Sequence, residues 1–493
     1  MLNNLIKKLK TNRLFILVIF LIVVFSCIYS YQSIKLYKAH RTRGDLTNFA
    51  QAMWNTTQGR IMQNTFNYSV HNFWGNRQMV IPDNSNIFGI HFNPILFLFI
   101  PLYFLYPHPE TLLIIQAVLT AAGGFFIFVI AKRKIKYDYI AFILTIAYFL
   151  YFAVLASVFN EFHASTLAIF FGLLMIYSKE YLKIKYYIFS LILFLFIQEN
   201  TAIVTIFYGL YLICSKKDRK IGILTSSLSI LYFIFTVKFA IPHLSNYKSF
   251  IFESVYGNPL GGSINDIVIN SIRNPILFLK TIFNNANLIY FGRFIVSSFP
   301  FSIFSPLMFL VGITALTPNI ISSSTALKSS ILHYDSIAVP FIFYSMILGA
   351  HNLANFIKKK YILLIFVVSS LILLIGTYTL YKKTISPEFN IHLLAQNIYT
   401  QSDADIDKII KLIPPNASVA TQDYISGQLS NRRRLYLFPV YANKVDYLLL
   451  STGQSVWPLE RKEQQKLINQ LVNDKKHAVI FKDKNFILIK RIN

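Results

Sequence analysis

Glu161 and Glu199 are carboxylates that could act in catalysis or binding and that stand at unusual positions in the sequence. Glu161 lies in the dense polar turn 159–163 and Glu199 in the turn 198–200, each between apolar runs with almost no loop to carry the charge into water. A carboxylate at a membrane boundary is costly, so both side chains are candidates for function. The alternative, that they cap helix ends and pair with an arginine of a neighbouring helix, stays open.

Asp45 offers a third carboxylate in a different setting. It follows Arg41, Arg43 and Gly44 and precedes the amphipathic stretch 46–54, so the pattern predicts an N-cap at Asp45. A helix N-terminus also favours the ionised form of a carboxylate. Capping and catalysis are therefore compatible at this position.

Histidines gather near the same segments, but their spacing matches no zinc signature such as HExxH. A hard divalent cation such as Mg²⁺ or Mn²⁺, held by carboxylate oxygens, needs fewer protein ligands because it keeps water ligands. The histidines that the predicted topology places at or beyond the outer boundary are His40, His71, His91, His108, His163, His243 and His333.

Composition indicates a polytopic membrane protein. Of 493 residues, 55% are hydrophobic and 14% are charged, which excludes an ordinary chain of soluble domains. The net charge is +26, but the cations lie beside apolar runs, where the positive-inside rule explains them and no nucleic-acid partner is expected. Cys27 and Cys214 lie within apolar runs and are expected to be packing residues.

Eleven apolar runs are predicted to be membrane-spanning helices. The N-terminus is expected in the cytoplasm, because four cations precede the first run without a signal-peptide cleavage site. The runs are 14–31, 111–131, 139–158, 164–177, 186–197, 201–214, 221–241, 288–298, 304–316, 336–350 and 361–381.

A twelfth apolar run, 91–106, is expected to dip into or lie on the outer leaflet. It contains Pro94 and Pro101 and is short for a span. Excluding it places the basic clusters 132–134 and 216–220 in the cytoplasm together with 179–185 and 358–360.

The expected architecture is an all-α polytopic membrane domain, 1–385, with about 11 transmembrane helices and long outer loops at 32–90 and 242–287. The C-terminal part, 386–493, reads as a small α/β domain outside the cytoplasmic membrane. Its predicted elements are a helix near 405–412, a strand at 417–421, strands at 434–440 and 445–451, a helix at 459–473, and a hairpin of 477–481 with 486–490.

Several segments resemble a prokaryotic membrane-protein family of unknown function that is itself similar to the GT-C glycosyltransferases. They are 44–55 (Gly-Asp-Leu-Thr-Asn-Phe-Ala-Gln-Ala-Met-Trp-Asn), 88–94 (Phe-Gly-Ile-His-Phe-Asn-Pro), the helix start 112–116, His333-Tyr334 before Pro340, and 414–420 (Pro-Pro-Asn-Ala-Ser-Val-Ala). The likeness covers nearly the whole chain, through the order of the segments.

The resemblance implies transfer of a sugar from a polyprenyl-phosphate donor on the outer face, with inversion. Asp45 would be the general base. His333 and Tyr334 resemble the Arg/His-Tyr pair that meets the lipid phosphate in GT-C enzymes.

Other residues would complete the site that the resemblance implies. GT-C enzymes often have two adjacent acids in the first loop, whereas Gly44 and Leu46 flank Asp45, so Glu161 would supply the second carboxylate, for catalysis or with Asp45 for a divalent ion. His91, Arg60 and Arg293 would help to bind the donor from the same face, with His163 and Glu199 in support.

Two other functions fit a chain of this kind. A transporter or flippase of a lipid-linked or anionic substrate would use the outer carboxylates as gating groups, but the inverted repeats typical of transporters are not seen. A catalytically silent scaffold that presents 386–493 is the other alternative. The donor sugar and the acceptor cannot be read from the sequence.

Overall fold

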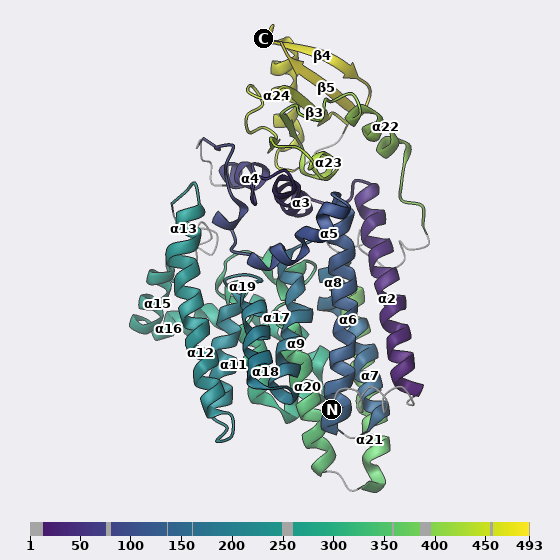
Figure 1. Cartoon of the computed structure of the whole chain (residues 1–493), viewed down its shortest axis with the longest axis vertical. Coiled ribbons are helices and arrows are strands. Elements are labelled where there is room, and N and C mark those ends of the chain that lie inside the picture. The colour runs from purple at the N-terminus through teal and green to yellow at the C-terminus, as the bar shows by residue number, and fades with distance from the viewer. Residues whose placement is uncertain are drawn as a thin grey trace.

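The computed structural model shows a bundle of helices with a small β-sheet beyond one end of the bundle (Figure 1). It describes residues 13–74, 80–135, 137–159, 161–248, 260–356, 359–384, 396–453 and 457–492.

Each of the eleven apolar runs forms helix. This is expected of runs that are apolar on every face, because such helices lie in a protein core or in a membrane. In chain order the helices are α2 (Arg13–Lys38), α6 (Pro109–Ile135), α7 (Asp138–Phe149) with α8 (Phe152–Phe159), α9 (Ala168–Tyr181), α10 (Ile184–Leu195), α11 (Thr201–Ile213), α12 (Arg219–Ile234), α17 (Asn285–Ser298), α18 (Pro306–Thr314), α20 (Val339–Phe356) and α21 (Lys359–Thr384).

Few of these helices are long enough to cross a membrane alone. Within the described part of the chain, three qualify by length and composition: α2, α6 and the stretch Arg219–Leu244. The pair α7 and α8, bent by 42°, adds a fourth if it counts as one span. The expected number of about eleven spans is therefore not confirmed, because helices such as α10 and α18 fall well short of the roughly 20 residues that a span needs.

The run 91–106 forms short pieces rather than one long helix. It contains the 3-10 helix η2 (Pro94–Phe99) and then α5 (Ile100–Leu105), with a proline in the first turn of each. α5 contacts α3 (Gly44–Thr57) near the end of the bundle that faces the sheet (Figure 1). This short geometry agrees with the expectation that the segment does not cross.

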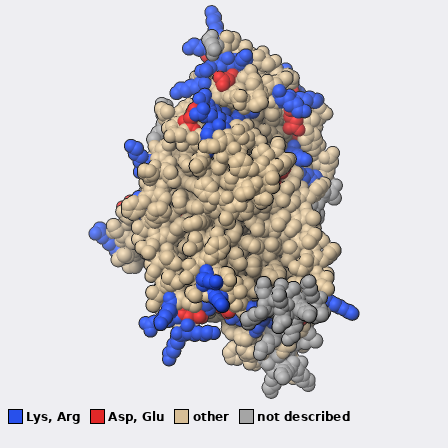
Figure 2. Space-filling view, in the orientation of Figure 1, with Lys and Arg blue, Asp and Glu red and all other residues tan. Residues whose placement is uncertain are grey.

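Three basic clusters meet at the end of the bundle opposite the sheet. Lys134 pairs with Glu180, and Lys179 lies 2.8 Å from Glu180 and 2.6 Å from Asp218. Figure 2 shows Lys and Arg around acidic side chains at this lower end of the molecule. The clusters 132–134, 179–185 and 216–220 thus share one end, as the expected topology requires.

The C-terminal part contains a five-stranded sheet in the order β2-β1-β3-β5-β4. The strand β1 is parallel to β2 and β3, whereas β5 is antiparallel to β3 and β4. The predicted strands, hairpin and two helices are confirmed. Their bounds are α22 (Gln401–Ile410), β1 (Val419–Thr421), β2 (Leu435–Leu437), β3 (Tyr447–Ser451), α24 (Arg461–Asn473), β4 (His477–Lys482) and β5 (Phe486–Arg491). The short helix α23 (Asp423–Ser426) was not predicted.

The outer loop 32–90 joins the bundle to the sheet. It folds into α3 and α4 (Phe66–Trp74), which lie between the two parts (Figure 1). Thr65 Oγ1 donates to Leu435 O at 2.8 Å and accepts from Leu435 N, while Leu437 N donates to Ser69 Oγ at 2.7 Å. Apolar residues of the loop also enter the two cores of the sheet.

The second outer loop is also partly helical. Within 260–287 the structure describes α15 (Ile264–Arg273) and α16 (Pro275–Ile282), preceded by α13 (Ile241–Leu244). A further short helix, α19 (Thr317–Ile321), leads to the 3-10 helix η7 (His333–Asp335) that precedes α20.

Candidate active site

A cavity of about 220 Å³ lies where α3 and α4 cover the end of the bundle. Several separate turns and helices contribute to it, and most of its polar groups are amides, imidazoles and one carboxylate. Its lining residues are Asp45, Asn48, Phe49, Asn67, Val70, His71, Ile90, His91, His163, Ser165, Gln198, Asn200, Ala315, Asn319, Leu327, His333, Tyr334 and Ile337.

Asp45 reaches the cavity from the first turn of α3. The helix begins at Gly44, so the N-cap residue is Arg43 and not Asp45, and the N-cap expectation is wrong. The reason lies in tertiary structure: the Leu46 N–H donates to Glu161 Oε2 at 2.9 Å, so a side chain distant in sequence serves the helix end. Asp45 is released from capping and faces the cavity.

The two carboxylates lie close enough to influence each other. Burial raises the pKa of Asp45 to about 6, although His91 and Arg43 lower it. Burial raises the pKa of Glu161 well above its usual value, and the charge of Asp45 raises it further. Glu161 is 4% exposed and does not line the cavity, so at neutral pH Asp45 is the group that carries the charge there.

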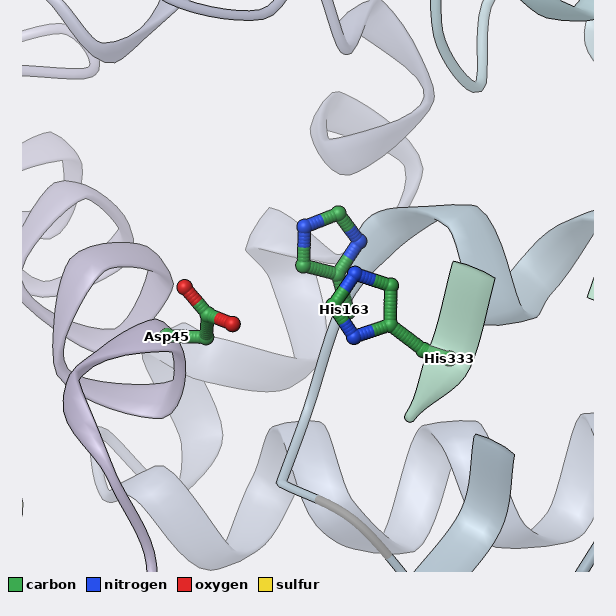
Figure 3. A group of neighbouring side chains, drawn as sticks. All are labelled: Asp45, His163 and His333. Carbon is green, nitrogen blue, oxygen red and sulfur yellow. The ribbon is translucent and has the colours of Figure 1, made fainter. Parts of the chain in front are cut away.

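His163 and His333 form the wall opposite Asp45. Their rings stack with centroids 3.6 Å apart and planes 11° apart. The side chains of Asp45, His163 and His333 each present a ligand atom within 4.8 Å of the other two (Figure 3). The Ser336 hydroxyl donates to Ser165 O at 2.9 Å, which ties the segment of His333 to that of His163.

Both imidazoles of this stack are neutral near pH 7. Burial lowers the pKa of His163 well below its usual value, with His333 and His91 adding to the effect. Burial, and then His91, lower the pKa of His333 to about 3. A nitrogen lone pair is therefore available on each ring.

The half-buried His91 and the buried Glu199 form a pair at another side of the cavity. His91 Nδ1 lies 2.7 Å from Glu199 Oε1, and the Phe92 N–H donates to Glu199 Oε2 at 3.2 Å. A carboxylate that accepts from Nδ1 fixes the tautomer and the orientation of an imidazole. The expected supporting role of Glu199 thus has a geometric basis in its contact with His91.

The predicted donor-binding residues are not all brought together. Tyr334 lines the cavity beside His333. Arg60 donates from Nε to Asn55 Oδ1 at 2.8 Å and does not line the cavity. Arg293 does not line it either, since its Nη1 donates to Lys328 O and Ser329 O, both at 2.8 Å.

Sequence reasoning passed over the amides of the site. Asn48 lies one helical turn after Asp45, Gln198 and Asn200 flank Glu199, and Asn319 lies on α19. The first three could have been found from their proximity to the candidate carboxylates. Asn319 lacked such a signal, because only folding brings its amide to within 2.9 Å of Tyr290 Oη and 3.3 Å of Tyr334 O.

No curated protein matches this chain in sequence. Among solved structures, the chain is similar to the crystal structure of ArnT from Cupriavidus metallidurans bound to undecaprenyl phosphate. The identity is 11% and the TM-score 0.45, and the match covers 96% of this chain and 97% of that chain.

A family profile described as "predicted membrane protein (DUF2079)" matches residues 35–488. This range includes nearly all of the outer loop 32–90, the helices of the bundle after α2 and nearly the whole C-terminal sheet. The membrane-protein family that the sequence segments indicate is thereby confirmed. The chain belongs to the DUF2079 family of predicted membrane proteins.

Proposed function

We propose that this protein is a membrane glycosyltransferase that moves a sugar from a polyprenyl-phosphate donor to an acceptor on the outer face of the cytoplasmic membrane. The observation that carries the proposal is the position of Asp45. Its carboxylate lies in a cavity roofed by α3 and α4, at the bundle end opposite the basic clusters. The positive-inside rule places those clusters in the cytoplasm, so the cavity would open to the other side.

Asp45 has the properties of a general base. A pKa of about 6 keeps the carboxylate ionised at neutral pH while making it more basic than an ordinary aspartate. Asp45 would take the proton of the acceptor as the acceptor attacks the anomeric carbon of the donor. The bond from that carbon to the phosphate oxygen breaks, polyprenyl phosphate leaves with the electron pair, and a single displacement inverts the configuration.

The His91–Glu199 pair supports binding of the donor phosphate. Glu199 accepts from Nδ1, which aims the other edge of the ring away from Glu199, and His91 lines the cavity. As an imidazolium, His91 would donate from both nitrogens, from Nδ1 to Glu199 and from Nε2 to a phosphate oxygen, and the second contact would be a charge-assisted hydrogen bond, stronger than a neutral one. Tyr334 adds a phenol from the same cavity.

The test is transfer by Asp45→Asn protein. Membranes that contain the wild type or the variant are incubated with radiolabelled polyprenyl-phosphate sugars, and labelled product is measured. We expect Asp45→Asn to accumulate normally, because Glu161 and not Asp45 serves the α3 end, and to lose at least ~10²-fold in rate.

Asp266→Asn is the matched control. Asp266 also lies in the first turn of an outer helix, α15, but is exposed and does not line the cavity. It should retain the wild-type rate. A wild-type rate in Asp45→Asn protein would remove Asp45 from the mechanism, and absence of transfer by the wild type from every donor tested would contradict the proposed reaction.

A further inference from the structure

Asp45, His163 and His333 bring a carboxylate and two imidazoles, the side chains of many metal sites, close together. One ligand atom from each lies within 4.8 Å of the other two, and the three side chains come from α3, the turn before α9, and η7 (Figure 3). We propose that these three residues bind a divalent transition-metal ion of the zinc class. The inference rests on the geometry of the three side chains and does not require the proposed reaction.

A buried nitrogen without a partner points independently to a ligand. His333 is 2% exposed, and its Nδ1 has no hydrogen-bond partner among the described residues. Burying a polar atom without a partner is unfavourable, and such atoms in folded proteins call for an explanation such as an ion. A metal ion bound by His333 would supply the missing interaction.

Ser165 holds one edge of the His163 ring. His163 Nδ1 lies 2.8 Å from Ser165 Oγ, and the Ser165 N–H approaches the same nitrogen at 3.3 Å. Imidazoles that bind metals almost always donate from their other nitrogen, so metal binding through Nε2 requires the tautomer in which the Nδ1–H of His163 donates to Ser165 Oγ. The nitrogen on the opposite edge is then the one available to the ion.

The donor set selects the kind of metal. Two imidazole nitrogens with one carboxylate oxygen suit Zn²⁺ and related ions, whereas Mg²⁺ prefers oxygen ligands throughout. The site therefore differs from the expected Mg²⁺ or Mn²⁺ site at Asp45 and Glu161, because Glu161 Oε2 is engaged by the Leu46 N–H. Three protein ligands leave a position open toward the cavity, as in catalytic zinc sites.

Binding requires one ring to leave the stack. With planes only 11° apart and centroids at 3.6 Å, the in-plane lone pairs of the two rings run side by side and do not converge on one point. Zinc ligands lie about 2.0–2.1 Å from the ion, so all three ligand atoms must come within about 4.2 Å of one another. His333 is the ring that can turn, since its Nδ1 gives up no hydrogen bond.

The test is metal binding by the purified full-length protein in detergent. The protein is stripped with a chelator, exposed to Zn²⁺ or Mg²⁺, passed over a desalting column, and analysed for bound metal. We expect one Zn²⁺ per chain and no retained Mg²⁺. Asp45→Asn, His163→Gln and His333→Gln should each weaken Zn²⁺ binding at least tenfold in a competition titration, whereas His108→Gln, at an exposed histidine outside the cavity, should not.

X-ray absorption of the zinc-loaded wild type provides a measurement that needs no variant. Two imidazole ligands are expected. The proposal is overturned if the wild type retains no Zn²⁺, if every folded single variant binds as tightly as the wild type, or if the absorption spectrum shows no imidazole. Because no donor sugar is present, these results stay independent of whether transfer occurs.

Discussion

At the scale of single residues, burial sets the charge of the groups around the cavity. Asp45 and Asp423 are near each other, and burial raises the pKa of each to about 6. Asp423 lies on α23, where its Oδ1 accepts from the Tyr424 N–H at 2.8 Å. This bond, a bond from the backbone N–H of Asp423 itself and the charge of Arg43 lower the pKa, but they do not offset the loss of water around the ionised carboxylate.

Asp423→Asn should reveal this cost as a pH-dependent change in stability. The folded-state pKa of about 6 exceeds the ordinary value of 3.8, so the stabilising contribution of Asp423 is full below 3.8 and is lost as the pH rises through 6. Asn carries no charge to bury. Above pH 7 the free energy of unfolding of the variant should therefore exceed that of the wild type by up to roughly 3 kcal/mol, and this difference should disappear near pH 4.

The measurement is the thermal midpoint of unfolding of both proteins in detergent from pH 4 to pH 8. Asp405→Asn, on α22, is the control, because its parent residue is half-exposed and its carboxylate is therefore not removed from water. A difference between wild type and Asp423→Asn that stays constant with pH would show that ionisation of Asp423 is not the cause.

At the scale of elements, α3 depends on a side chain from another part of the chain. Glu161 Oε2 accepts from the Leu46 N–H, one of the first helical N–H groups that lack a partner within the helix. This contact fixes the backbone at Leu46. Because Asp45 is the residue before Leu46, the contact also helps to fix the position of Asp45. Glu161 can therefore matter for transfer without touching a substrate.

Substitutions at Glu161 separate positioning from catalysis. Glu161→Gln keeps an acceptor oxygen for Leu46, so stability and transfer should remain close to wild type. Glu161→Ala leaves a buried N–H without a partner, so it should cost about 1–3 kcal/mol and reduce transfer. Thermal midpoints and transfer rates of the two variants are compared; loss of transfer in folded Glu161→Gln protein would instead give Glu161 the catalytic role predicted from the sequence.

At the scale of the whole molecule, Gln51 connects the first outer loop to the C-terminal part. Its Nε2 donates to Arg432 O and Arg433 O, both at 3.2 Å, and its Oε1 accepts from the N–H groups of Thr65 and Phe66, both at 3.1 Å. Gln51 is fully buried on α3, the helix that carries Asp45. The sheet therefore helps to hold the roof of the cavity.

Gln51→Leu should loosen this connection, because the backbone groups that it serves lose their partners in a buried place. We expect the free energy of unfolding to fall by about 1–3 kcal/mol. Amide hydrogen exchange should rise in residues 64–70 and 432–437 together. Gln58→Leu, at the exposed end of the same helix, should leave the exchange unchanged; a rise confined to 64–70 would contradict a shared connection.

The predicted orientation of the molecule can be tested with single cysteines. In protein whose Cys27 and Cys214 are replaced by serine, a cysteine at the exposed Asn84 should react with an impermeant reagent added to intact cells. A cysteine at the exposed Lys217 should be protected until the cells are opened. Labelling of both positions from outside would overturn the topology on which the outer-face function depends.

The sequence by itself determined the local structure and the chemical inventory. Long apolar runs formed helices, short apolar runs between turn residues formed β1 to β5, and the short pieces of 91–106 followed from Pro94 and Pro101. Asp45, His91, His163, His333 and Tyr334 were named as site residues, and all five line one cavity. Such residues can be recognised in a sequence because ionisable side chains at the ends of apolar runs are costly and therefore rare.

Tertiary structure alone decided which of these groups meet and what each does. Glu161 was expected beside Asp45 as a ligand or catalyst, yet its Oε2 accepts from the Leu46 N–H, while His163 and His333 come together across 170 residues of sequence. The number of spans was likewise not decided by the sequence, because short apolar helices such as α10 and α18 are packed against other helices, α10 against α9 and α18 against α20. The spacing of residues along a chain predicts helices and strands. Contacts between distant segments depend on how whole elements pack, which no local sequence pattern predicts.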